Sequence, residues 1–192
     1  MKRLAILGAS GHGKVVADIA GLCGWGEVQF FDDAWPDVSA NGHWDVVGDS
    51  ETLLSQLPGF DGVVIAIGNN EIRADKLSWL NSHKAPLVSL VHPSAVISRY
   101  ATVADGSVVM AGVVVNVDTQ VGAGAILNTG CSIDHDCILG ECVHISPGAQ
   151  LAGGVTIGDC GWVGIGAVVR QLIAIGERAV IGAGAAVVNN VP

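Results

Sequence analysis

The sequence is 192 residues long, and its composition already excludes several classes of protein. Half of the residues are apolar and 14% are charged, which excludes a disordered chain. The 27 glycines are about twice the usual share, but they do not recur at every third residue, so the chain is not collagen-like. A formal net charge of −9 argues against a nucleic acid or an anionic membrane as partner. The length allows one or two domains.

No stretch of the sequence predicts a membrane-spanning helix, because the apolar runs are short and interrupted. The apolar run near the N-terminus, residues 4–7, is too short for a signal peptide. The five cysteines are odd in number and include no CxxC pair. We therefore expect reduced thiols buried as small core residues of a cytoplasmic protein, and no metal site.

Residues 1–90 predict a small α/β domain, because strand-like and helix-like segments alternate there. The predicted strands are residues 3–7, 28–31 and 62–67, and the predicted helices are residues 14–22, 51–57 and 71–81. The first helix is expected to bury Val15, Ile19 and Leu22 on one face. These elements predict a parallel sheet with helices on its faces, about half of a Rossmann-type dinucleotide fold.

Residues 91–192 follow a different rule, because every sixth residue from Val91 through Val187 is Val, Ile or Leu. Neither a helix nor a strand has a period of six, whereas a β-helix of hexapeptides does, with three hexapeptides in each 18-residue coil. We expect the aliphatic residue to point inward and the small residue four positions later to fill the corner. Glycines that directly follow the aliphatic position, such as Gly122 and Gly140, are expected to relieve backbone strain.

Several stretches resemble one family. They are NTGCSIDHDCILGECVHISPGAQLAGGVTIGD (residues 128–159), ILGASGHGKVVADIA, FFDD and IAIGNNEIR. They are similar to the left-handed β-helix, hexapeptide-repeat acyltransferases, in the branch that acetylates nucleotide-activated amino sugars and is related to sialic acid O-acetyltransferases. The resemblance implies acetyl-CoA as donor and a homotrimer with active sites between subunits. The family's repeats usually continue past residue 190 into a tail that helps to hold coenzyme A. The sequence ends at Pro192, so it is shorter than the whole protein or the nucleotide end of the donor is held differently.

Two outward-facing histidines, His135 and His144, are the candidates for chemistry, although an outward histidine is more often a solvated or interface residue. Asp134 and Asp136 flank His135, and the resemblance makes the histidine of the HD pair the catalytic base. A neutral imidazole suits proton removal from an amine, because its pKa lies near the operating pH. We expect Asp136 to accept the other ring N–H, with Asp134 as the competing candidate.

The resemblance also assigns binding residues in the β-helix. Asn128 would lie near the acceptor sugar. Acetyl-CoA would be held by His144, Ala152, Gly153, Ile165, Gly182 and Ala183. His144 and a backbone N–H near Gly153 are candidates to stabilise the oxyanion of the tetrahedral adduct.

A glycine-rich loop after the first strand, Gly8 to Gly13, opens a predicted helix whose backbone N–H groups could bind phosphate. The signal is weak, because the spacing is not GxGxxG. We expect a nucleotide-linked sugar to be bound by Ser10, Gly11, His12, Gly13, Asp32, Asp33, Ile67, Gly68, Asn69 and Arg73. For Asn69, a helix N-cap is an equally good interpretation.

The leading hypothesis is an N-acetyltransferase of glycan biosynthesis that acts on a UDP-linked or similar amino sugar, with a 4-amino-4,6-dideoxy sugar as the expected acceptor. The alternatives are O-acetylation of a sialic acid type of sugar and a non-catalytic, trimeric nucleotide-sugar-binding protein. Two others are an NAD-dependent oxidoreductase and the zinc carbonic anhydrase that shares the β-helix. The half-sized sheet argues against the oxidoreductase, and the spacing of His135 and His144 argues against the carbonic anhydrase.

Overall fold

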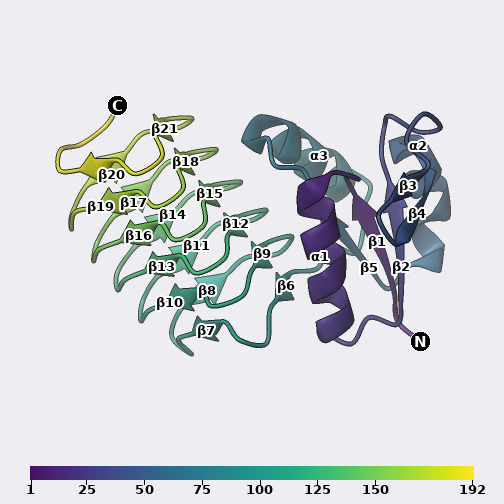
Figure 1. The fold of residues 1–192 in the computed structure, drawn as a ribbon, viewed down its shortest axis with the longest axis horizontal. Coiled ribbons are helices and arrows are strands. Elements are labelled where there is room, and N and C mark those ends of the chain that lie inside the picture. Colours follow the sequence, from purple (N-terminus) through teal and green to yellow (C-terminus); the bar gives the residue numbers. More distant parts are fainter. The chain divides into compact units, whose positions relative to one another are not determined.

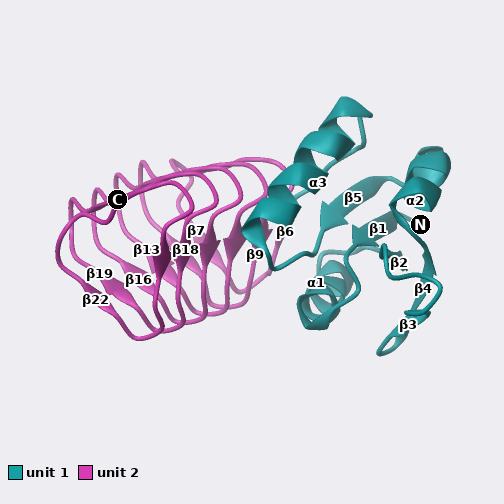
Figure 2. Ribbon diagram, turned by 90° about the horizontal axis from the view of Figure 1, so that it is seen from above, with its two compact units in different colours: residues 1–90 teal, residues 91–192 magenta.

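The computed structural model describes residues 1–192 and divides them into two compact units, Met1–Leu90 and Val91–Pro192 (Figure 2). Unit 1 is a mixed α/β domain and unit 2 is a parallel β-helix, as the sequence predicts. No helix of the structure combines the length and the apolar character that a membrane span requires.

Unit 1 is built on a five-stranded sheet in the order β3-β4-β2-β1-β5. Its strands are β1 (Arg3–Leu7), β2 (Glu27–Phe31), β3 (Ala40–Asn41), β4 (Trp44–Gly48) and β5 (Gly62–Ile65). Its helices are α1 (Gly11–Leu22), α2 (Ser50–Gln56), the 3-10 turn η1 (Leu57–Gly59) and α3 (Asn70–Ser82). Helix α1 covers one face of the sheet, and α2 and α3 cover the other (Figure 2). All strand pairs are parallel except β3 with β4.

Two expectations about unit 1 are wrong in detail. Of the predicted buried face of α1, Ile19 is confirmed, but Val15 and Leu22 are exposed and the helix buries Val16 and Ala20 in their place. The sheet also contains β3 and β4, which the sequence did not predict. Strand β4 adds to the sheet as a parallel neighbour of β2, with a register irregularity between Phe30 and Phe31.

Unit 2 is a stack of coils whose two-residue strands form three parallel sheets (Figure 1). The first sheet holds β6 (Leu90–Val91), β9 (Val108–Val109), β12 (Ile126–Leu127), β15 (His144–Ile145), β18 (Trp162–Val163) and β21 (Val180–Ile181). The second holds β7 (Val96–Ile97), β10 (Val114–Val115), β13 (Ser132–Ile133), β16 (Gln150–Leu151), β19 (Val168–Val169) and β22 (Ala186–Val187). The third holds β8 (Thr102–Val103), β11 (Gln120–Val121), β14 (Ile138–Leu139), β17 (Thr156–Ile157) and β20 (Ala174–Ile175).

Each of these strands ends on the aliphatic residue that recurs at every sixth position. Each strand pairs with the strand 18 residues away in the neighbouring coil, as Ile133 pairs with Leu151. From Val109 onward every such aliphatic side chain is buried, which confirms the inward orientation. The first three positions are less covered: Val91 is exposed, with 38% of its surface accessible, and Ile97 and Val103 are half-buried. The buried stripe forms the continuous apolar core of the solenoid.

The glycines act differently from our expectation. Those directly after the aliphatic position, such as Gly122, lie outside the left-handed backbone region. Gly122 is needed because a Cβ there would lie 2.6 Å from the backbone of Gly140 in the next coil. The left-handed backbone occurs two residues later, as at Gly130 and Gly154. Asp118 and Asp136 occupy this same corner position with φ of 60° and 58°.

Candidate functional site

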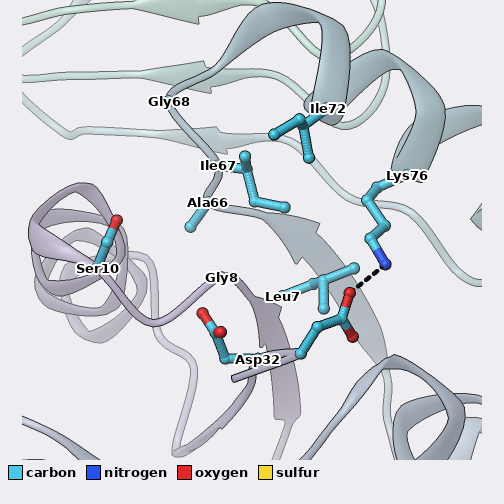
Figure 3. Close-up of a pocket in the computed structure, with 10 residues that line it drawn as sticks. Leu7, Gly8, Ser10, Asp32, Ala66, Ile67, Gly68, Ile72 and Lys76 are labelled. Atoms are coloured by element: carbon cyan, nitrogen blue, oxygen red, sulfur yellow. Dashed lines mark hydrogen bonds and ion pairs between the residues drawn. The ribbon is translucent and has the colours of Figure 1, made fainter. Parts of the chain in front are cut away.

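In unit 1, a cavity of about 280 Å³ lies at the carboxyl ends of β1, β2 and β5 (Figure 3). Strand β2 pairs with β1 on one side, and β5 pairs with β1 on the other side. The cavity therefore lies at the point where the strand order reverses. Ligands of open α/β sheets bind in such crevices. The lining residues are Leu7, Gly8, Ser10, Asp32, Asp33, Ala66, Ile67, Gly68, Ile72 and Lys76.

Five of the predicted nucleotide-binding residues line this cavity: Ser10, Asp32, Asp33, Ile67 and Gly68. Gly11, His12 and Gly13 are not among the lining residues; they form the first turn of α1. Ser10 is the N-cap residue, but its side chain makes no capping hydrogen bond, and it lies at one end of the view in Figure 3. The backbone N–H groups of this turn are the kind of donors that bind phosphate.

The glycine-rich loop is shaped by close backbone approaches. Gly8 has φ of 112°, and a Cβ there would lie 2.8 Å from the carbonyl oxygen of Ala66. A Cβ on Gly13 would lie 2.5 Å from the carbonyl oxygen of Gly8. These glycines therefore let α1 start directly against the ends of β1 and β5.

The two aspartates after β2 have different partners. Asp32 accepts hydrogen bonds from the backbone N–H groups of Ala9 (2.7 Å) and Ala34 (2.9 Å), so it shapes the glycine-rich loop. Asp33 accepts from the backbone N–H of Ser50 (3.0 Å) and forms an ion pair with Lys76 (2.6 Å). Burial alone would raise the pKa of Asp33, but the hydrogen bonds from Lys76 and Ser50 outweigh it and lower the pKa below its usual value.

Asn69 and Arg73 lie at the start of α3, just after the loop that follows β5, and the burial of Arg73 corrects its assignment to a direct contact with the substrate. The side chain of Asn69 caps α3 by accepting from the N–H of Ile72 (3.1 Å). Arg73 is completely buried and donates to the carbonyl oxygen of Ile67 (2.8 Å) and to the side chain of Asn70 (2.8 Å). A side chain with no exposed surface positions the loop and does not itself face a ligand.

His12 is a half-buried, neutral histidine. Burial and then the nearby charge of Arg73 lower its pKa to about 4. Its Nε2 is inaccessible to solvent and has no hydrogen-bond partner. The imidazole therefore remains uncharged in the folded protein at neutral pH.

In unit 2, His135 lies at the exposed corner between β13 and β14, and its ring Nδ1 is 2.7 Å from Oδ2 of Asp136. The neighbouring Asp134 accepts from the backbone N–H of His135 (2.9 Å) and from the side chain of Asn116 (2.9 Å). The hydrogen bond to Asp136, followed by the charge of Asp134, raises the pKa of His135. Asp136 is thus the ring partner, and Asp134 holds the backbone of the loop.

Gly153 packs directly against the ring of His135. A Cβ on Gly153 would lie 2.5 Å from Cε1 and 2.6 Å from Nε2 of the imidazole. Ala152 lines a hollow of about 410 Å³ next to this corner, together with Asn116, Ser132, Asp134, Gln150, Leu151, Val168 and Val169. Ala152 and Gly153 therefore lie beside the proposed base and do not share a surface with His144.

His144 is buried, with 9% of its surface exposed, although its place in the repeat is not an inward-facing one. Trp162, one coil further along, covers it in a stacked arrangement with ring centroids 5.1 Å apart. The Oδ1 of Asn128 accepts from the N–H of Thr129, which directs Nδ2 of Asn128 to Nε2 of His144 at 3.2 Å. Because Nδ2 is a donor, Nε2 is the acceptor and the ring proton is on Nδ1.

Four predicted acetyl-CoA residues do lie together, in an apolar groove of about 440 Å³. They are His144, Ile165, Gly182 and Ala183, and the groove also includes Ser146, Pro147, Trp162, Gly164, Val180 and Ile181. His144 and Trp162 belong to the first sheet of the coil, whereas His135 follows the second. One copy of the chain therefore presents the base and the groove on different sides.

All five cysteines are free thiols, and four of them are buried in the β-helix. Burial raises the pKa of Cys131 to about 12 and also raises that of Cys137, so these thiols are not nucleophiles at neutral pH. The exception to the expected burial is Cys23, which is exposed at the end of α1.

Lys76 and Trp162 are two residues of these sites that sequence reasoning missed. Lys76 has no local signal, because it reaches Asp33 only through the packing of α3 on the sheet. Trp162 did carry a signal, since it lies 18 residues, one coil, after His144.

Comparisons with known proteins agree with this architecture. Residues 3–80 match the PglD N-terminal domain family. Over 114 residues the chain is 35% identical to UDP-N-acetylbacillosamine N-acetyltransferase of Bacillus subtilis. That stretch is 58% of this chain and 52% of that protein, so the match spans about half the length of this relative.

Several solved structures are similar over the whole chain. The acetyltransferase domain of PglB from Neisseria gonorrhoeae, in complex with acetyl coenzyme A, is 40% identical with a TM-score of 0.95, covering 100% of this chain and 93% of that one. PerB from Caulobacter crescentus, in complex with CoA and GDP-perosamine, is 37% identical with a TM-score of 0.93, covering 100% of this chain and 91% of that one.

Proposed function

Because the chain belongs to the PglD-type family of left-handed β-helix, hexapeptide-repeat acetyltransferases that act on nucleotide amino sugars, we propose that it transfers an acetyl group from acetyl-CoA to the amino group of a nucleotide-linked sugar in glycan biosynthesis. The expected acceptor is a 4-amino-4,6-dideoxy sugar. The observation that carries the proposal is the His135–Asp136 pair, 2.7 Å apart on an exposed corner of the β-helix.

The chemistry requires removal of a proton from the attacking nitrogen. Asp136 accepts the N–H at Nδ1 of His135, so the lone pair of Nε2 is free to take that proton. The same contact raises the pKa of His135 and makes it a stronger base. Asp136 also stabilises the imidazolium that forms, as the carboxylate of a catalytic triad does.

We assign the acetyl-CoA arm to the apolar groove beside His144. His144 is held by Asn128 and Trp162, and the groove's glycines allow close approach of a slender chain. With Nε2 of His144 occupied by Asn128, its ring acts as a fixed neutral group and not as the base. Arg99, Arg170 and Arg178 are the basic residues of unit 2 and are candidate partners for the phosphates of coenzyme A.

We further propose a homotrimer, because the base and the groove lie on different sides of one coil and a complete site needs two copies. Exposed apolar side chains on these sides fit an interface: Ile138, Trp162, Ile165, Val168 and Val180. Molar mass by light scattering tests this, and a monomer that is fully active would contradict it. The free thiols fit the reducing cytoplasm as the compartment.

In unit 1, we assign the nucleotide diphosphate to the cavity at the ends of β1, β2 and β5. The first turn of α1 would bind phosphate, and Asp32 holds the glycine-rich loop in place for it.

The deciding experiment mixes the protein with acetyl-CoA and UDP-, dTDP- or GDP-linked 4-amino sugars and follows the release of free thiol. We expect release with at least one amino sugar and none with the matching 4-hydroxy sugar. Release with free sialic acid but with no amino sugar would refute N-acetylation.

A further inference from the structure

Leu172 is an aliphatic residue in an unusual place. It lies at the corner between β19 and β20 with φ of 62°, in the left-handed region, where a bulky apolar residue is a clear exception. The same corner holds Asp118, Asp136 and Gly154 in the three preceding coils. With 78% of its surface exposed, Leu172 is also the most exposed large apolar residue of unit 2. A side chain that is both strained and exposed points to a role outside its own coil.

The side chain of Leu172 leans back over the coil that carries Gly153 and Gly154. Its N–H donates to the carbonyl oxygen of Gly153 (3.0 Å), and its Cδ2 lies 2.7 Å from the position that a Cβ on Gly154 would take. On the other side, Gly153 packs against the ring of His135. One glycine of this pair makes room for the base and the other makes room for Leu172. Leu172 therefore belongs to the surroundings of the base.

The corner that carries the base and the apolar groove beside His144 run in parallel along the stack of coils (Figure 1). Each of the three successive coils β13–β15, β16–β18 and β19–β21 carries one residue at the corner and one in the groove. The pairs are His135 with His144, Gly153 with Trp162, and Leu172 with Val180. The groove thus begins level with the base and extends into later coils, where Leu172 and Val180 share one level.

We propose that Leu172 forms the second wall of the acetyl-CoA groove of a neighbouring copy and holds the pantetheine arm in line with His135. This inference rests on the proposed function and on the proposed trimer. In a three-fold trimer whose coils run side by side, equal coils lie level. A donor whose acetyl group is between His135 and His144 therefore extends its arm between Leu172 and Val180. Both are exposed aliphatic side chains, at 78% and 69%, and they become buried when the arm lies between them.

The other residues of this corner would not provide such a wall. An aspartate, as at Asp136, would place a charge against an apolar groove, where it would lose its hydration. A glycine, as at Gly154, would leave the arm without contacts on that side. Leucine supplies the apolar contact, although its backbone conformation is unfavourable.

The test uses Leu172→Asn, because asparagine adopts the left-handed region readily and the corner keeps its backbone. The dissociation constant of CoA, measured by calorimetry, and the KM of acetyl-CoA should both rise about tenfold, the effect of burying part of a leucine side chain. The KM of the amino sugar should stay unchanged. S-acetylpantetheine, a donor without the nucleotide, should be affected by the same factor, because it shares the arm. Leu172→Met should retain most of the affinity.

Leu22→Asn is the matched control, because Leu22 is an exposed leucine at the end of α1 and does not line the groove. Unchanged CoA affinity in Leu172→Asn would overturn the assignment. So would loss of the trimer in that variant by light scattering, since Leu172 would then be a subunit contact.

The outcomes also separate this inference from the proposed function. Acetyl transfer to an amino sugar, with CoA affinity that does not respond to Leu172→Asn, would leave the proposed function intact and refute the contact. Weakened CoA binding in Leu172→Asn, in a protein that acetylates no amino sugar, would refute the proposed function and leave the contact standing.

Discussion

The two units present their functional groups in opposite ways. In unit 1, the polar groups around the cavity also hold the fold together: Asp32 holds the glycine-rich loop, and the buried Arg73 of α3 donates to the loop after β5. In unit 2, the fold depends on the buried aliphatic stripe, and His135 is an exposed side chain on a corner. Substitutions in unit 2 should therefore separate activity from stability, whereas substitutions in unit 1 should change both.

The largest expected effect is the loss of the base. His135→Ala should lower kcat/KM by about 10²–10⁴-fold, the usual contribution of a general base, and leave the thermal midpoint almost unchanged because the side chain is exposed. Thiol release and a melting curve measure the two quantities. His83→Ala, at the exposed end of α3, is the control. A His135→Ala enzyme with full activity would remove His135 from the mechanism.

Unit 1 contains the largest expected effect on stability. Folded His12 stays neutral down to about pH 4, whereas the unfolded chain takes up a proton below about pH 6.5. The unfolded state then binds more protons, so the free energy of unfolding falls as pH falls through this window, by roughly 3 kcal/mol in total. Denaturant titrations between pH 7 and 4 should show this extra fall relative to His12→Gln. Equal pH slopes in both proteins would contradict it, and His43→Gln should behave as the unmodified chain.

Gly153→Ala should displace the ring of His135 without destabilising the fold. The added methyl displaces the ring of His135, an exposed side chain that can rotate away from Asp136 at little cost to folding. We expect kcat to fall about 10²-fold, as misplaced catalytic groups do, with little change in melting. Gly21→Ala, where a methyl meets open space on α1, should have neither effect. Strong destabilisation by Gly153→Ala would mean that the corner is rigid.

The smallest effect is a shift of the pH profile. Asp136 raises the pKa of His135, so Asp136→Asn should move the acidic limb of the kcat/KM profile to lower pH, because the base stays unprotonated further into acid. Asp118→Asn changes the equivalent corner one coil earlier and should leave the limb in place. If the acidic limb of the kcat/KM profile does not move in Asp136→Asn, the limb reports the protonation of a group other than His135.

The sequence predicted unit 2 almost completely, because a hexapeptide coil is specified by short-range spacing. It predicted the strands of unit 1 less well, since β4 depends on pairing with β2 and the buried face of α1 depends on the sheet beneath it. The functional residues also divide into those that short-range sequence predicts and those that depend on folding. His135 and Asp136 are adjacent in sequence, whereas Lys76 meets Asp33 only after folding.

Asp136 occupies a corner position where many coils have glycine, and its backbone is in the left-handed region at φ of 58°. A non-glycine residue in that conformation costs on the order of 1–2 kcal/mol. Replacement by glycine would relieve this strain and would also remove the carboxylate that orients His135. The most stable version of this corner is therefore not the most active one, and selection for thermostability alone would erode catalysis here first.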